Sequence, residues 1–292
     1  MRKVLLTILA GVVLLACGGC GSLANSGRLL STSDEITVGS RIQPEFERLL
    51  GGKVKDEAVQ RYVQRVGQRI ASVAGRRLPY EFAVLRPDVP NYFVLPGGKI
   101  YLTKGLLAML EDERQLAGVL ANAVGHACHR QPVKAIFKRM KTGMYLAVAK
   151  LAIEDPDESG YRTAIRLARE LILSEATRRD EMQADALAVQ YLARADYSPW
   201  GLAHAQRMLY QRCIDQPKKM TKLYQSHPLT FRRMKLTKVA VEIDYAYYDR
   251  SRPSPTQDDY AAVRRSFLGD DDRVATDTHE PAPQPVLAEN AN

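Results

Sequence analysis

Apolar residues recur at helical spacing along most of the chain. Between residues 56 and 74, the positions of Val59, Tyr62, Val66, Ile70 and Val73 come close to a 3.6-residue repeat, which predicts an amphipathic helix. Similar patterns predict helices at residues 34–49, 105–110, 116–130, 134–151, 161–173, 177–193, 200–213 and 228–241. Ser33 or Asp34 is the expected N-cap of the first helix, and Pro44 is expected to kink or divide it.

Two stretches have the pattern of strands. Tyr80, Phe82 and Val84 occupy every second position within residues 76–86, as in a strand that follows a turn. Residues 89–103 contain a Pro-Gly-Gly turn at 96–98 before a β-prone segment, which predicts a strand and a hairpin-like edge. The expected fold class is therefore α+β, mainly α-helical, with a small β-sheet.

The N-terminus has the features of a leader. Arg2 and Lys3 precede the apolar run of residues 4–16, which is too short for a comfortable membrane span and suits a signal peptide. The run ends in Leu-Leu-Ala before Cys17, similar to a bacterial lipoprotein cleavage box with Cys17 as the lipidated residue. Cys20 is the weaker acceptor, and an ordinary cleaved signal with an incidental cysteine is the alternative. Gly18 after Cys17 favours the outer over the inner membrane, with the protein facing the periplasm.

The leader and a polar C-terminus bracket one domain. We expect a signal peptide at 1–16, a tether at 17–33, a domain at 34–249, and a disordered tail at 250–292, where Pro, Asp, Ser and Thr dominate. The chain of 292 residues carries a net charge of +9, or 9 − 2 = +7 without Arg2 and Lys3. These charges are scattered and not interleaved with aromatic residues, so nucleic acid is not an expected partner. No disulfide can be assigned to Cys128 and Cys213.

Residues 116–130, LAGVLANAVGHACHR, form an apolar helix with the first candidate chemistry. In an H-E-x-x-H helix, two histidines four residues apart share a zinc ion, and the glutamate polarises the metal-bound water. His126 matches the second histidine, whereas Asn122 and Ala123 stand at the positions of the first histidine and the glutamate. Taken alone, His126 is more typical of a packed core histidine.

Further polar residues lie on later segments. Glu181 and Asp185 are one helical turn apart within residues 177–193. A solvated acidic face balanced by Arg178 and Arg179 is the alternative interpretation of this pair. His227 precedes Pro228 and the helix that contains Arg233.

Four blocks in this order resemble one family of zinc metallopeptidases. They are residues 91–101 (NYFVLPGGKIY), 116–126 (LAGVLANAVGH), 177–185 (TRRDEMQAD), and the pair His227-Pro228 followed by Arg233. The family is metallopeptidase family forty-eight, which contains the CAAX prenyl endopeptidases, mitochondrial inner-membrane quality-control proteases and bacterial periplasmic lipoprotein proteases. The resemblance runs from about residue 34 to 241 and implies a gluzincin-like domain whose motif helix lines the cleft.

The resemblance also implies roles for individual residues. It makes His126 the second zinc ligand and Glu181 the third, with Asp185 orienting a histidine ligand. It places His227 near the mouth of the cleft, with Arg233 helping to bind substrate or an oxyanion. His129, one turn after His126, is either a substitute ligand or a residue that lies at the surface or beside a ligand. If metal binds despite Asn122, either His129 or His227 would complete the site with His126 and Glu181. Extended clients are expected to pair with the strand around Gly98, Lys99, Ile100 and Tyr101.

The sequence departs from the family pattern at positions 122 and 123, which supply a zinc ligand and the general base in the H-E-x-x-H motif. Asn122 offers a neutral amide, which is a poor zinc ligand, and Ala123 removes the general base. Loss of general acid–base help typically costs about 10²–10⁴ in rate. The expected function is that of a periplasmic, membrane-anchored member of a quality-control protease family, inactive or weakly active as written. The alternatives are a pseudopeptidase that binds clients without cutting them, and a lipid-tethered structural protein without a client cleft.

Overall fold

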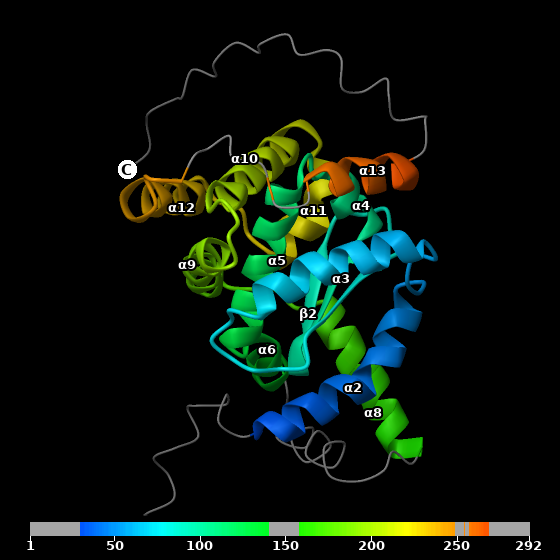
Figure 1. The fold of residues 1–292 in the computed structure, drawn as a ribbon. Helices are drawn as coiled ribbons and strands as arrows, with labels where there is room; N and C mark the ends of the chain where they lie inside the picture. Colours follow the sequence, from blue (N-terminus) through cyan, green and yellow to red (C-terminus); the bar gives the residue numbers. More distant parts are fainter. Residues whose placement is uncertain (1–29, 140–157, 249–253, 255–256, 269–292) are drawn as a thin grey trace, which may run out of the picture.

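The computed structural model describes residues 30–139, 158–248, 254 and 257–268 (Figure 1). Their elements, in chain order, are α2 (Thr32–Leu49), α3 (Glu57–Ala71), β1 (Glu81–Leu85), β2 (Tyr92–Leu95), the 3₁₀ turn η2 (Pro96–Gly98), β3 (Lys99–Thr103), α4 (Lys104–Met109), α5 (Glu113–Cys128), α6 (Gln131–Arg139), α8 (Glu158–Ile172), α9 (Arg178–Arg194), α10 (Trp200–Asp215), α11 (Pro217–Ser226), α12 (Phe231–Asp244) and α13 (Gln257–Leu268). This mainly helical fold with a small sheet confirms the predicted class. The signal peptide at 1–16, Cys17, most of the tether, and residues 140–157 and 269–292 lie outside the described residues.

The three strands form one sheet in the order β1-β3-β2. Strand β1 runs parallel to β3, with Phe82 opposite Ile100, and β2 runs antiparallel to β3, with Phe93 opposite Tyr101. This strand order contradicts the prediction that extended clients pair with the strand around Lys99. Lys99, Ile100 and Tyr101 belong to the middle strand, whose backbone already pairs on both sides, and Gly98 lies in η2. Strand β2 lies at an edge of the sheet.

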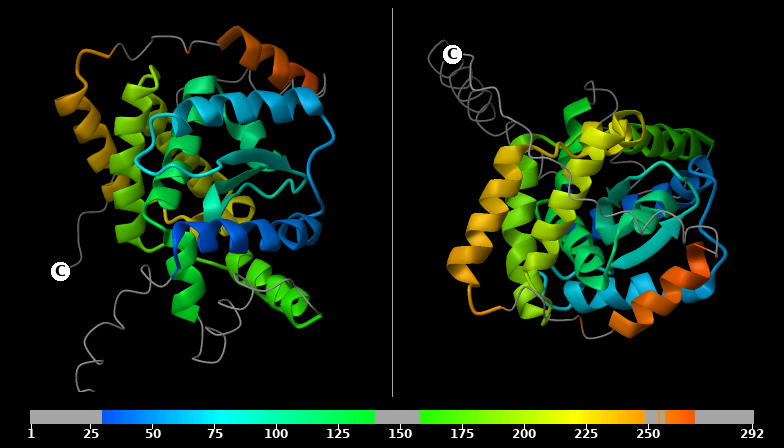
Figure 2. Two further views of the ribbon diagram at one scale, coloured as in Figure 1. Left: turned by 60° about the horizontal axis from the view of Figure 1, so that its bottom comes forward. Right: turned by 90° about the horizontal axis from the view of Figure 1, so that it is seen from above.

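The alternation of side chains divides the sheet between two cores. Phe82, Val84 and Leu102 point into the larger core, which they share with α3, α5 and α10. Leu85 and Tyr101, on the opposite face, point into a second core with α2 and α8. Figure 2 shows α3 and α2 on opposite sides of the strands. The period of two in a strand therefore places one helix layer on each face.

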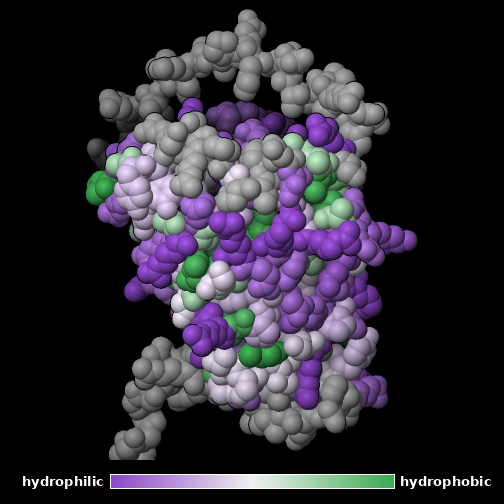
Figure 3. Space-filling view, viewed as in Figure 1, coloured by the Kyte–Doolittle hydropathy of each residue, from purple (hydrophilic) through white to green (hydrophobic). Residues whose placement is uncertain are grey.

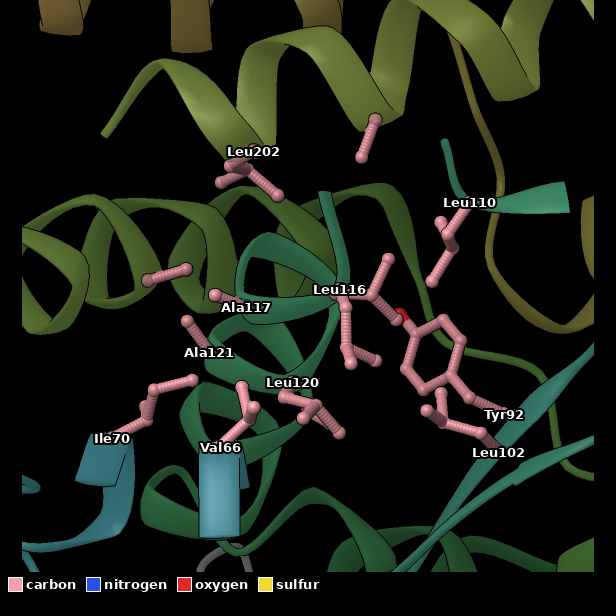
Figure 4. Close-up of a cluster of buried hydrophobic side chains, with 14 of the residues drawn as sticks. Val66, Ile70, Tyr92, Leu102, Leu110, Leu116, Ala117, Leu120, Ala121 and Leu202 are labelled. Atoms are coloured by element: carbon pink, nitrogen blue, oxygen red, sulfur yellow. The ribbon is translucent and has the colours of Figure 1, made fainter. Parts of the chain in front are cut away.

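Helix α5 lies at the centre of the larger core. Its residues are buried almost throughout, which agrees with its apolar sequence. Figure 4 shows Leu116, Ala117, Leu120 and Ala121 of α5 lying between α3, the strands and α10. Glu113 in its first turn is also fully buried, and the hydroxyls of Tyr62 and Tyr197 donate to its carboxylate. The helix that carries the motif is thus held from several sides.

Local predictions near the N-terminus need two corrections. Ser31, rather than Ser33 or Asp34, caps α2, and its hydroxyl accepts from the Asp34 amide in a capping box. Pro44 does not divide the helix, which continues to Leu49. The carbonyl that loses its partner there belongs to Ser40, an exposed residue that water can reach.

Two helices near the C-terminal end were not expected. Helix α11 fills the interval before His227, and α13 lies inside the stretch expected to be disordered. The Tyr260 hydroxyl of α13 donates to the carbonyl of Leu110 at 2.7 Å, and Arg65 of α3 forms an ion pair with Asp259. These contacts order a segment whose composition alone does not predict a helix.

The surface in the view of Figure 3 is mostly hydrophilic, with separate apolar spots. In the part of the chain that the structure describes, no helix combines the length and apolar character that crossing a bilayer requires. Cys128 and Cys213 are both free.

Gly118 provides a test of the packing between α5 and α10. A Cβ added there would lie 2.7 Å from both the Cα and the amide nitrogen of Leu202, which are backbone atoms that cannot yield cheaply. Helix propensity alone would favour Gly118→Ala by about 0.5–1 kcal/mol. We nevertheless expect this substitution to lower the free energy of unfolding by about 1–3 kcal/mol.

Urea unfolding followed by circular dichroism measures this change. Gln190→Ala, at an exposed position of α9, is the control and should stay within about 0.5 kcal/mol of the parent. A stabilised Gly118→Ala protein would show that α10 does not approach α5 this closely.

Candidate metal centre

Two neighbouring helices present the motif residues to each other. Asn122, Ala123 and His126 are buried on α5, and Glu181 and Asp185 are buried on α9. The two helices approach closely at the glycine before His126, where an added Cβ would lie 2.7 Å from a backbone carbonyl oxygen of α9. This glycine thus lets α9 bring its carboxylates to the histidine. The alternative of a solvated acidic face is wrong, because Glu181 is 0% and Asp185 5% exposed.

His126, Glu181 and His227 form one cluster. The Oε1 atom of Glu181 lies 3.4 Å from His126 Nε2 and 2.8 Å from His227 Nδ1. One ligand atom from each of the three residues lies within 4.8 Å of the others, and among the described residues this is the group arranged to hold a metal ion. His129, the other histidine considered as a ligand, caps the end of α5 outside this group.

The other nitrogen of each imidazole is already engaged. His126 Nδ1 contacts the side-chain oxygen of Gln131, and His227 Nε2 lies 3.2 Å from the backbone carbonyl of Tyr92. The Tyr92 ring also stacks on His227 with 3.7 Å between centroids. His126 Nε2, by contrast, is buried and makes no hydrogen bond. This arrangement turns both ligand nitrogens toward Glu181.

The pKa shifts of His227 and Glu181 favour the neutral imidazole and the ionised carboxylate, which are the forms that bind a cation. Burial lowers the pKa of His227 and outweighs the opposing effect of Glu181. Burial raises the pKa of Glu181, but Arg233, His126 and His227 reverse this and hold it well below its ordinary value. A neutral His227 has one proton and cannot donate to both Tyr92 and Glu181. With that proton on Nδ1, the ring donates to Glu181; with the proton on Nε2, the Nδ1 lone pair faces the carboxylate, and a positive ion between them would stabilise that arrangement.

The donor set and its spacing fit zinc. Two histidines and one glutamate are a known catalytic zinc ligand set, and zinc bonds of about 2.0–2.2 Å place tetrahedral ligands about 3.3 Å apart. The separations of 3.4 Å and 2.8 Å from Glu181 Oε1 lie near that value. The third donor that the geometry offers beside His126 and Glu181 is His227, on the loop before α12, whereas the residue at position 122 lies outside this group.

Arg233 links the two carboxylates of α9 to α12. Its Nη1 lies 2.6 Å from Glu181 Oε2, and its Nε and Nη2 donate to Asp185 at 2.5 and 2.8 Å. Burial lowers the pKa of Arg233, but Asp185 and Glu181 more than offset this and raise it. Arg233 therefore neutralises buried charge, whereas the resemblance suggested contact with substrate or an oxyanion.

Asn122 occupies the position of the missing ligand with a different role. Its Oδ1 accepts from the Tyr92 hydroxyl at 2.6 Å, and its Nδ2 donates to Asp185 Oδ1 at 2.7 Å. Asp185 thus contacts the residue at position 122, although that residue is an amide rather than a histidine ligand. Ala123 is fully buried and supplies no proton acceptor.

Sequence reasoning missed Tyr92 and Gln131. Tyr92 lies within the first block of the resemblance, so its neighbourhood was recognised but not its contacts. Gln131 also donates from Nε2 to the carbonyl of Asp180 at 3.0 Å and so connects α6 to the start of α9. Nothing in the sequence pattern marks Gln131, because its role depends on the turn between α5 and α6.

A cavity of about 110 Å³ opens beside the cluster. The edge strand β2 contributes Tyr92, Phe93 and Val94 to its wall, and His126 and His227 also line it. A hollow between an edge strand and the motif helix α5 is therefore present, and its strand is β2 rather than the predicted β3.

Arg233→Met tests the buried ion pairs. The substitution leaves two buried carboxylates without their main counter-charge, so we expect a loss of about 3–5 kcal/mol in the free energy of unfolding. Urea unfolding in the presence of EDTA gives the value without a contribution from metal. Arg232→Met, next to it on the exposed face of α12, should change stability by less than about 0.5 kcal/mol. Equal effects of the two substitutions would contradict the assigned ion pairs.

The chain matches known proteins over the same region. The model of peptidase family M48 matches residues 57–239. The mitochondrial metalloendopeptidase OMA1 of Schizosaccharomyces pombe is 34% identical over 154 residues, which cover 52% of this chain and 43% of that protein. The β-barrel assembly-enhancing proteases of Yersinia pestis and Escherichia coli are 23% and 25% identical, over 84% and 72% of this chain and 50% and 44% of theirs.

The chain thus spans half or less of the length of these relatives. The matched region contains the sheet, α5 and α9, and all residues of the cluster around Glu181. The family model covers more than half of the chain and agrees with the four sequence blocks. This protein belongs to peptidase family M48.

Proposed function

We propose that this protein binds zinc through His126, Glu181 and His227 and holds extended protein clients without cutting them at an appreciable rate. The observation that carries the proposal is the combination of an intact donor cluster with Ala123 at the base position. Zinc bound there would act as a Lewis acid on a client carbonyl or on water. Hydrolysis also needs a group that accepts a proton from that water.

The residues of the chain support binding more than cleavage. The side chain of Ala123 cannot take a proton, and the amide of Asn122 is engaged at both ends by Tyr92 and Asp185. Edge strand β2 has a strand neighbour on one side only, within the described sheet. Its residues line the 110 Å³ cavity, so an extended client can pair with its backbone there.

We further propose that the protein acts in protein quality control in a bacterial cell envelope. Several relatives are named for enhancing β-barrel assembly, which supports this setting. A lipid anchor at Cys17, the periplasmic side and the outer membrane are supported by the leader sequence alone. Unfolded or extended proteins are the proposed clients.

Restoring the two lost residues tests the catalytic part of the proposal. The full chain and its Asn122→His/Ala123→Glu variant are compared for hydrolysis of unfolded casein with zinc supplied. The variant should cut casein at least about 10²-fold faster than the parent, because it regains the general base. Asp185 already accepts from the side chain at position 122, so a histidine there finds an orienting acceptor.

Zinc content supplies the control for this comparison. The parent should bind one zinc ion, and His227→Ala should lose it while remaining folded by circular dichroism. Cleavage by the parent at the rate of the variant would contradict the proposed lack of activity. A parent without zinc would contradict the proposed ligand set.

Gln131→Leu tests the orientation of His126. Removing the acceptor for Nδ1 should weaken zinc binding by about 10–100-fold, as measured by competition with a chelating indicator. Gln131→Glu keeps an acceptor oxygen and should bind zinc within a few-fold of the parent. Unchanged affinity in Gln131→Leu would show that this contact does not position the ligand.

A further inference from the structure

A second, smaller cavity adjoins the metal centre on the side of α10. Its volume is about 30 Å³, and Tyr92, Asn122, His227 and Arg233 of the centre contribute to its wall. The remaining wall is mostly aliphatic and includes Leu202, Leu209, Leu223 and Leu229. Tyr92 and His227 line both cavities, so the two cavities adjoin at this pair, and a side chain of a client bound along β2 would reach the smaller one past these rings.

Gln206 of α10 is an unusual residue in this wall. It is 3% exposed, and neither its side-chain oxygen nor its side-chain nitrogen has a hydrogen-bond partner among the described residues. Burying an unpaired amide costs free energy, and buried polar groups in folded proteins nearly always have partners. A leucine would suit such an aliphatic wall better. The glutamine therefore requires a partner that enters the cavity.

The chemistry of Gln206 specifies that partner. Its amide offers one acceptor oxygen and an NH₂ donor side by side, and another primary amide matches both at once through two hydrogen bonds. The small volume admits a short side chain. Arg233 in the wall is already balanced by Glu181 and Asp185, so the cavity offers no free counter-charge to a charged side chain. A cavity of this size can also hold a water molecule, for which about 10–15 Å³ suffices. Water is therefore the competing partner.

We propose that this cavity is a subsite that accepts the side chain of an asparagine residue in a bound client. The proposal rests on the client binding proposed above and adds a preference to it. Gln206 pairs with the client carboxamide, while the leucines contact its methylene group. When no client is bound, water takes the same place. Selectivity for such clients would then explain why the chain keeps a residue in this aliphatic wall that lowers its free energy of unfolding.

Peptide binding to the full chain tests this preference. The probes are fluorescein-labelled ten-residue peptides of alternating Ala and Thr, with Asn, Leu or Ala placed at each position in turn. Fluorescence polarisation should reveal one position at which Asn binds about tenfold tighter than Leu, the difference expected from two neutral hydrogen bonds. Leu is the matched control because it has the branching of Asn without its polar atoms.

Substitution of Gln206 separates a subsite from a water site. Gln206→Leu should unfold at an equal or higher urea concentration than the parent and should lose the preference for Asn. Gln206→Met, an unbranched replacement, should behave in the same way and guards against a folding defect in the first variant. Gln211→Leu, at an exposed position of the same helix, should keep the preference.

Three other outcomes would contradict the proposed subsite. If peptides bind but no position prefers Asn, or if the preference survives in Gln206→Leu and Gln206→Met, the subsite is overturned and Gln206 pairs with water alone. If no peptide binds to any of the proteins, the proposed client binding fails and the subsite fails with it.

Discussion

The ion pairs of Arg233 are the interaction on which the rest of the centre depends. Two carboxylates on α9 lie in the interior, where isolated charges are strongly disfavoured. Arg233 reaches them from α12 and contacts both, and it is itself buried. Because it neutralises Asp185 and part of Glu181, one oxygen of Glu181 remains directed at the two histidines. Helices α9 and α12 therefore share a common charge network with the loop that contains His227.

The same network explains how the centre keeps its shape without the usual motif. A histidine at position 122 would donate a ring N–H to Asp185, and the Asn122 amide makes the corresponding contact. The carbonyl end of this amide receives the Tyr92 hydroxyl and so ties α5 to the edge strand. Asn122 thus provides hydrogen bonds to α9 and to the edge strand without offering a good metal ligand. Chemistry and architecture are thus separable at this position.

His227 connects the metal centre to the proposed client-binding edge. Its ring stacks on Tyr92 and contacts the Tyr92 carbonyl, while its other nitrogen faces Glu181. His227 thus joins the ligand cluster to strand β2 through direct contacts. In the proposed function, this contact allows bound zinc to stabilise the loop before α12 and the adjacent strand together.

The sequence by itself determined most of the helices, the order of the family blocks and the presence of His126 and Glu181 in one site. The helices depend on local periodicity, which is a property of neighbouring residues, whereas the shared site of His126 and Glu181 was implied by the resemblance of the four blocks to a known family. Only the tertiary structure decided that β3 is the middle strand, because strand order depends on pairing between distant segments. It likewise decided that His227 rather than His129 joins the cluster, that Gln131 contacts His126, and that α13 packs on α3. Contacts of this kind join residues that are brought together by the loops and the core, and no local pattern in the chain specifies them.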